Sequence, residues 1–124
     1  MDQLSKKIGV DETDFSRILD FLPYPFILSE IRGNARCNIF HNRKFIEEIG
    51  YTPEEIPTIE EWFHYAYPDL KYRNEIIHEW KRREVIAKNE KRDFIIMQAR
   101  IHTKNLGDKW YEVKASIVGQ IQFI

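Results

Sequence analysis

Apolar side chains recur at helical spacing over residues 11–22, and Pro23 and Pro25 follow directly. This pattern predicts a short amphipathic helix that begins at a cap on Asp11 or Thr13 and ends before the prolines. Its apolar positions are Phe15, Ile18, Leu19 and Leu22. We therefore expect the apolar face of this helix to pack against another apolar surface.

Two strand patterns follow the prolines. Residues 26–31 and 36–41 are short and largely apolar, and Gly33-Asn34 between them is a turn signal. The two segments predict a β-hairpin.

The middle of the chain carries repeated signals for helix starts. Asn42 can cap a helix that runs to Ile49 and stops at Gly50. Thr52 and Thr58 each precede a glutamate by three residues, the spacing of a capping box. Asp69 can cap the longest helix, which we expect to run to about Lys88.

Residues 94–103 and 110–118 alternate strictly, which predicts two strands with one buried face. The turn between them is 105–108, and Gly119-Gln120 is a further turn signal before a last strand at 121–124. Phe94, Ile96 and Trp110 fall on the outer face in this phase. The order of strands and helices predicts an α+β fold with an antiparallel sheet.

Composition narrows the class of protein. The chain has 124 residues with 19 basic and 20 acidic side chains, which fits one domain and lacks the basic excess of a nucleic-acid-binding protein. No apolar run approaches the roughly 20 residues of a membrane span, and we find no signal peptide. We therefore expect a cytoplasmic domain that makes no contact with a membrane or nucleic acid.

Catalytic chemistry is not evident from the sequence. The four histidines show no zinc-binding spacing, the single Cys37 leaves no cysteine pair, and no glycine-rich phosphate loop occurs. No serine or cysteine has an identifiable base near it in sequence. We expect that the domain is not an enzyme.

Several motifs occur in the order found in PAS domains, the sensory-box family. Residues 42–56 resemble the signature of an asparagine-led helix, then Gly-Tyr, then Thr-x-Glu-Glu and an apolar residue. Tyr67-Pro68-Asp69 resembles the family's His-Pro-Asp before its long helix. Arg100 and the turn 107–110, which ends in Trp110, resemble its strand arginine and Gly-x-x-Trp turn. Departures are Tyr67 for histidine, Leu70 for aspartate and Gln98 for glutamate.

The resemblance implies a fold and a division of the chain. It implies a PAS-like five-stranded antiparallel sheet with the short helices and the long helix on one face, plus the N-terminal amphipathic helix. Residues 1–10 would be a tail, 11–22 a flanking helix, and 23–124 the PAS-like domain, truncated in or near its last strand. The chain would then be the N-terminal sensor module of a bacterial signalling protein.

The resemblance also implies a function. The domain would bind a small ligand, or relay a conformational signal, to an output domain of the histidine kinase (two-component) or diguanylate cyclase type outside this chain. The candidates for a cavity between sheet and helices are Ile27, Phe45, Trp62, Tyr72, Ile76, Trp80, Met97, Ala99 and Val113. The alternative for this set is ordinary core packing. The matching alternative for the domain is a structural homodimerisation module with a filled core and no ligand.

We also expect a homodimer, because aromatic side chains on the outer face of the sheet would be exposed to water in a monomer and could be buried in an interface. The candidate dimer-face residues are Phe15, Ile18, Leu19, Phe94, Ile96 and Trp110. The ligand itself is unknown from the sequence. Haem held by His78 on the long helix is conceivable, but an ordinary boundary histidine is the preferred interpretation. A cystatin-like enzyme or carrier is a third alternative, disfavoured because the long helix follows two strands.

Overall fold

A computed structural model describes residues 11–118 and 121–123 of the chain. The first helix, α2 (Glu12–Asp20), begins at an Asp11 capping box, and β1 (Ile27–Arg32) and β2 (Ala35–His41) form the expected hairpin. Three helices follow: α3 (Arg43–Glu48), α4 (Ile59–Ala66) and α5 (Leu70–Asn89). The last strands are β3 (Phe94–His102), β4 (Asp108–Val118) and β5 (Ile121–Phe123). The predicted tail 1–10 and the predicted turn at 119–120 lie outside the described residues.

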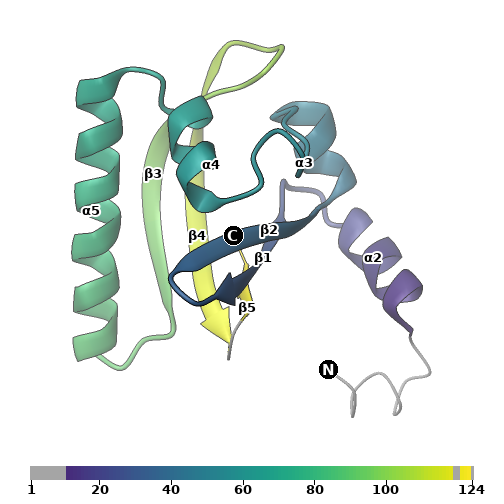
Figure 1. Cartoon of the computed structure of the whole chain (residues 1–124), viewed down its shortest axis with the longest axis horizontal. Helices are drawn as coiled ribbons and strands as arrows, with labels where there is room; N and C mark the ends of the chain where they lie inside the picture. The colour runs from purple at the N-terminus through teal and green to yellow at the C-terminus, as the bar shows by residue number, and fades with distance from the viewer. Residues whose placement is uncertain (1–10, 119–120, 124) are drawn as a thin grey trace.

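The core lies between α4, α5 and the inner face of β3 and β4 (Figure 1). Ile95, Met97, Ala99 and Ile101 are all buried, so the alternation predicted for β3 is confirmed. On α5 the buried side chains include Ile76 and Trp80. Burial of such side chains is the main favourable term in the stability of the fold.

The strands do not form the sheet that the PAS resemblance implies. They form two antiparallel hairpins, β1–β2 and β3–β4, which do not pair with each other. The hydrogen-bonding order β2-β1-β5-β4-β3 joins them only through β5, which has three residues and pairs with three residues of each neighbour. The α+β class is confirmed. The five strands are linked in one hydrogen-bonding order, but the prediction of a continuous PAS-like sheet is wrong, because the two hairpins meet only through the three residues of β5. Among the described residues, the three of β5 pair with only the end of β4 on its second edge, which local alternation could not reveal.

The N-terminal helix does not cover the outer face of β3–β4, where a cover for the exposed aromatic side chains was expected. α2 sits beside the start of α3, on the far side of the molecule from α5 (Figure 1). Nδ2 of Asn42 donates to the carbonyl of Leu19, and the backbone N–H of Arg43 donates to Asp20. The outer face of β3–β4 is therefore not covered by this helix, and Trp110 is 67% exposed.

The capping residues behave as expected, with one correction. Asn42, Thr58 and Asp69 are the N-caps of α3, α4 and α5. Thr52 also forms its reciprocal contacts with Glu55, but residues 53–56 form turns and no helix. Two capping contacts without a following run of helical hydrogen bonds are too little to propagate a helix.

Among the described residues, no helix combines the length and the apolar character that crossing a bilayer requires.

Candidate functional site

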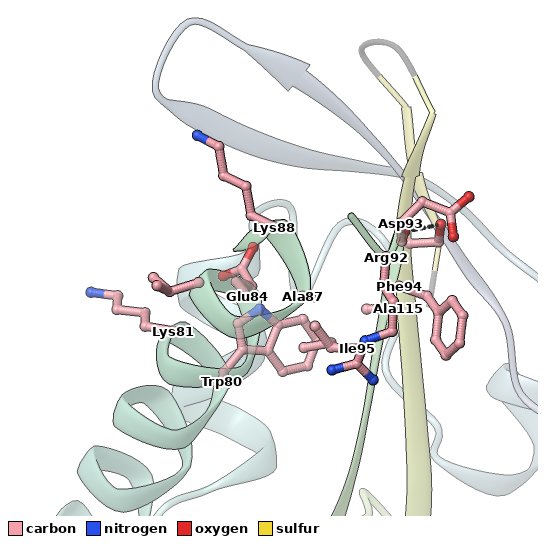
Figure 2. Close-up of a pocket in the computed structure, with 12 residues that line it drawn as sticks. Trp80, Lys81, Glu84, Ala87, Lys88, Arg92, Asp93, Phe94, Ile95 and Ala115 are labelled. Atoms are coloured by element: carbon pink, nitrogen blue, oxygen red, sulfur yellow. Dashed lines mark hydrogen bonds between the residues drawn. The ribbon is translucent and has the colours of Figure 1, made fainter. Parts of the chain in front are cut away.

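One cavity is a groove between the C-terminal half of α5 and the ends of β3 and β4, and we call it the α5 groove (Figure 2). Its volume is about 600 Å³, which lies in the range of small-molecule sites. The lining residues are Trp80, Lys81, Glu84, Val85, Ala87, Lys88, Arg92, Asp93, Phe94, Ile95, Ala115 and Ser116.

Trp80 forms the floor of the groove. The side chain is 3% exposed, and Figure 2 shows its ring projecting from α5 toward the strands. Phe63 packs edge-on against it, with ring centroids 6.0 Å apart. The indole Nε1 is buried and has no hydrogen-bond acceptor among the described residues. Such an orphaned donor costs about 1–3 kcal/mol.

Three cationic residues line the groove beside this apolar floor, and in Figure 2 the ammonium ends of Lys81 and Lys88 point away from the Trp80 ring. Lys81 and Lys88, two turns apart on α5, form no ion pair with another residue that the structure describes, and Arg92 pairs with Glu90 (2.7 Å). The one acidic residue of α5 in the groove, Glu84, is engaged by Arg36 of β2 at 3.2 Å. The rim is therefore net positive on the helix side, while Asp93 adds one carboxylate on the strand side.

This arrangement fits the binding of a ligand better than catalysis. An apolar floor, cations at the rim and an unused N–H donor can hold an apolar molecule with an anionic or carbonyl head group. Within the part of the chain that the structure describes, no group of three or more metal-ligating side chains comes together.

The second cavity has a volume of about 370 Å³ and lies between the segment leading into β1 and the middle of β4, and we call it the β1–β4 slot. Its lining residues are Leu22, Tyr24, Pro25, Phe26, Ile27, Phe45, Ile49, Trp62, Ile101, Tyr111, Glu112, Val113, Lys114 and Ser116. Ser116 borders both cavities, and its hydroxyl donates to the carbonyl of Asp93 (2.6 Å).

The structure divides the residues that we predicted for one cavity among three places. Ile27, Phe45, Trp62 and Val113 line the slot, and Trp80 lines the α5 groove. The remaining four line neither cavity: Tyr72, Ile76, Met97 and Ala99.

Three of those four are packed core residues. Ile76, Met97 and Ala99 are all buried. Tyr72 instead accepts a hydrogen bond from the backbone N–H of Arg100 (2.9 Å), and the Arg100 guanidinium lies 4.7 Å from its ring centroid. That contact ties α5 to the middle of β3.

The sequence analysis did not identify the cationic residues of the groove. No local pattern relates Lys81 to Arg92, which lies beyond the end of the helix. The available signal was the spacing of Lys81, Val85 and Lys88, which places an apolar residue between two lysines on one helical face.

The residues expected at a dimer interface are spread over two surfaces. Ile18 (48% exposed) lies on α2, whereas Ile96 (38%) and Trp110 lie on the outer face of β3–β4. Phe15, Leu19 and Phe94 are half-buried. The exposed apolar residues therefore do not form one continuous patch.

His78 is exposed on α5 and lines neither the α5 groove nor the β1–β4 slot.

A comparison with protein-family models gives no match for this chain, and a comparison with curated proteins gives none either.

Proposed function

We propose that this domain is a regulatory module that binds a small ligand in the α5 groove and that it performs no catalysis itself. The ligand class is a molecule with an apolar body and an anionic or carbonyl head group. The observation that supports this proposal is the orphaned Nε1–H of Trp80 beneath a rim carrying Lys81 and Lys88. An acceptor atom on a ligand would satisfy the donor. The cationic residues along the groove would attract an anionic head group.

Two structural links connect the α5 groove to other parts of the domain and could transmit the effect of ligand binding. The Glu84–Arg36 ion pair links α5 to β2, and Ser116 borders the β1–β4 slot as well as the groove. A ligand that binds more tightly when α5 is in one position shifts the equilibrium toward that position. The hairpin that contacts α5 would then shift with it. The output domain that receives this shift remains a prediction from the PAS resemblance, as does that family assignment.

The test is a titration with decanoate followed through the indole N–H signals of the three tryptophans. We expect the Trp80 signal to move and the exposed Trp110 signal to stay. Trp80→Phe removes the donor but keeps an aromatic floor, and we expect about tenfold weaker binding. Lys88→Gln should weaken binding, whereas Lys109→Gln, which is outside the groove, should not. An unmoved Trp80 signal at saturating decanoate contradicts the proposal.

Native mass spectrometry beside the denatured mass gives a second test. Extra mass that is lost on denaturation, absent from the Trp80→Phe variant, would identify a natural ligand of this groove. Extra mass retained by that variant would place the ligand elsewhere in the protein.

A further inference from the structure

β3 lies at one border of the sheet, and two side chains of α5 contact its outer edge. In the hydrogen-bonding order β2-β1-β5-β4-β3, it pairs with β4 and with no other strand that the structure describes. On the outer edge, the backbone N–H of Arg100 donates to the Tyr72 hydroxyl (2.9 Å). The carbonyl of Ile96 accepts from the Arg83 guanidinium. We call these two hydrogen bonds the edge contacts, and they occupy positions that a neighbouring strand would otherwise use.

The main-chain groups in the edge contacts belong to the set that points away from β4. Alternate residues of an antiparallel strand direct their N–H and C=O groups toward the same neighbour. β3 and β4 pair in unbroken register along 94–102 and 108–116. Ile96, Gln98 and Arg100 therefore present their main-chain groups along one outer edge, and Gln98 lies halfway between the two edge contacts.

The two edge contacts hold α5 along this edge. Figure 1 shows α5 beside β3, and the two elements are in contact. Tyr72 and Arg83 lie about three helical turns apart, roughly 16 Å along the helix axis. Their partners on β3 are roughly 13 Å apart along the strand. These similar spans allow one helix to reach both groups, so α5 covers the outer edge of β3.

Further interactions position both side chains. The Arg100 guanidinium lies 4.7 Å from the centroid of the Tyr72 ring. Nε of Arg83 donates to Glu79 over 2.7 Å. The cover is therefore part of a network that joins α5 to itself and to β3.

The sequence of β3 suits pairing with a copy of itself. Its nine residues are FIIMQARIH, in which Arg100 is the only lysine, arginine or carboxylate side chain. Apolar segments with high β propensity and little charge pair readily when an edge is exposed. If two β3 strands met antiparallel about a twofold axis at Gln98, Arg100 of one chain would lie opposite Ile96 of the other. The N–H of Arg100 would then donate to the carbonyl of Ile96, and these are the two groups that α5 occupies.

We infer that α5 covers the outer edge of β3 and that Tyr72 and Arg83 prevent this edge from pairing with β3 of a second copy of the chain. Movement of α5 away from the edge would free the donor and the acceptor together. Two copies would then join through one continuous antiparallel sheet. The inference goes beyond the proposed function, since it concerns a contact between copies and needs no ligand in the α5 groove.

The test compares self-association of the whole chain with that of the variant Tyr72→Phe/Arg83→Met, which lacks both edge contacts. We expect sedimentation equilibrium to show association at least about tenfold tighter for the variant. Hydrogen exchange at the amides of Ile96, Gln98 and Arg100 should slow as the concentration of the variant rises. That readout separates pairing of β3 edges from association through the face of the sheet that carries Trp110.

The matched control is Tyr65→Phe/Arg82→Met. Tyr65 is an exposed tyrosine of α4. Arg82 pairs with Glu79 (2.6 Å), as Arg83 does, but makes no hydrogen bond to β3 within the part of the chain that the structure describes. The control should associate no more tightly than the unmodified chain.

Gln98→Pro, added to Tyr72→Phe/Arg83→Met, should reverse the effect. The N–H of Gln98 points away from β4, so proline removes a donor from the outer edge and leaves the pairing of β3 with β4 intact. We expect association to return to the level of the unmodified chain.

No increase in association, an equal increase in the control, or an increase that Gln98→Pro leaves in place would each overturn the inference. Tyr72→Phe alone removes one hydroxyl and should tighten association about threefold. It is measured in place of the double variant if dispersed indole N–H signals show that the double variant does not fold, and no increase there would also overturn the inference. None of these measurements uses a ligand, so their failure is distinguishable from failure of the proposed function.

Discussion

Asn42 donates a hydrogen bond from its side-chain amide to the backbone carbonyl of Leu19 over 3.0 Å, so the residue that begins α3 also holds the end of α2. The same Nδ2 donates to the carbonyl of Tyr24 (3.1 Å). Its Oδ1 accepts from the N–H groups of Phe26 (2.9 Å) and Phe45 (3.0 Å). The side chain is fully buried, so each of its four contacts is made away from water.

Asn42→Asp should lower the free energy of unfolding by about 2–3 kcal/mol, because it keeps the cap acceptor but removes both donors and leaves two carbonyls facing a carboxylate. Urea denaturation measures the change. Asp69→Asn, at the exposed cap of α5, is the control and should cost far less. Equal stability of Asn42→Asp and the unmodified chain would show that the contacts to Leu19 and Tyr24 contribute nothing.

His41 should make the stability of the domain depend on pH. Its Nδ1 donates to the carbonyl of Tyr51 (2.8 Å), and its Nε2 is buried without a partner among the described residues. Burial lowers the pKa of the imidazole below its usual value of 6.5, against the smaller opposing effects of the Tyr51 carbonyl and Glu54. The unfolded chain therefore takes up the proton first as the pH falls.

We accordingly expect the free energy of unfolding to be unaffected by His41 above about pH 7 and to fall as the pH drops through 6.5. His41→Asn keeps a donor toward Tyr51 without a titrating group, and its stability should vary less between about pH 7 and 5. Urea denaturation at a series of pH values gives both slopes. Parallel slopes for the two proteins would contradict the assignment.

Gly50 should tolerate substitution less well than Gly33. Both have positive φ, +98° and +60°. A Cβ on Gly50 would lie 2.8 Å from the Cβ of Lys104, whereas a Cβ on Gly33 would meet nothing within 4 Å. Gly33→Ala should cost about 1 kcal/mol from the backbone conformation alone. Gly50→Ala should cost about 2 kcal/mol or more, because Lys104 must move as well. Thermal or urea denaturation measures the loss in free energy of unfolding for both variants. Equal losses would mean that Lys104 moves away from the new Cβ without an energetic penalty.

Trp110 tests the predicted homodimer. Its side chain is 67% exposed on the outer face of β4, so Trp110→Ser should change the stability of the monomer by about 0.5 kcal/mol or less. We expect it to abolish any concentration-dependent increase in sedimentation coefficient. Phe21→Ser is the matched control, since Phe21 is 88% exposed and lies just after α2. A dimer that persists in Trp110→Ser but not in Phe21→Ser would move the interface to the N-terminal helix.

Much of the local structure was predictable from the sequence. Alternation in residues 94–103 identified both β3 and its buried face, and the caps Asn42, Thr58 and Asp69 identified the starts of three helices. These signals are local, because a strand has a side-chain period of two and a cap acts within one turn. The site was only partly predictable. Trp80 could be assigned to the apolar face of α5, but the lack of an acceptor for its indole N–H depends on neighbours distant in sequence.

The sequence by itself determined where most of the helices and strands begin, which face β3 buries, and that the chain forms an α+β domain. The tertiary structure alone decided how the hairpins meet, that α2 lies by α3 and not on the outer face of β4, and that two cavities border Ser116. The physical reason is that strand pairing and cavity formation depend on contacts between segments far apart in sequence. Hydrophobic periodicity specifies the orientation of each element but not which partner occupies its edge.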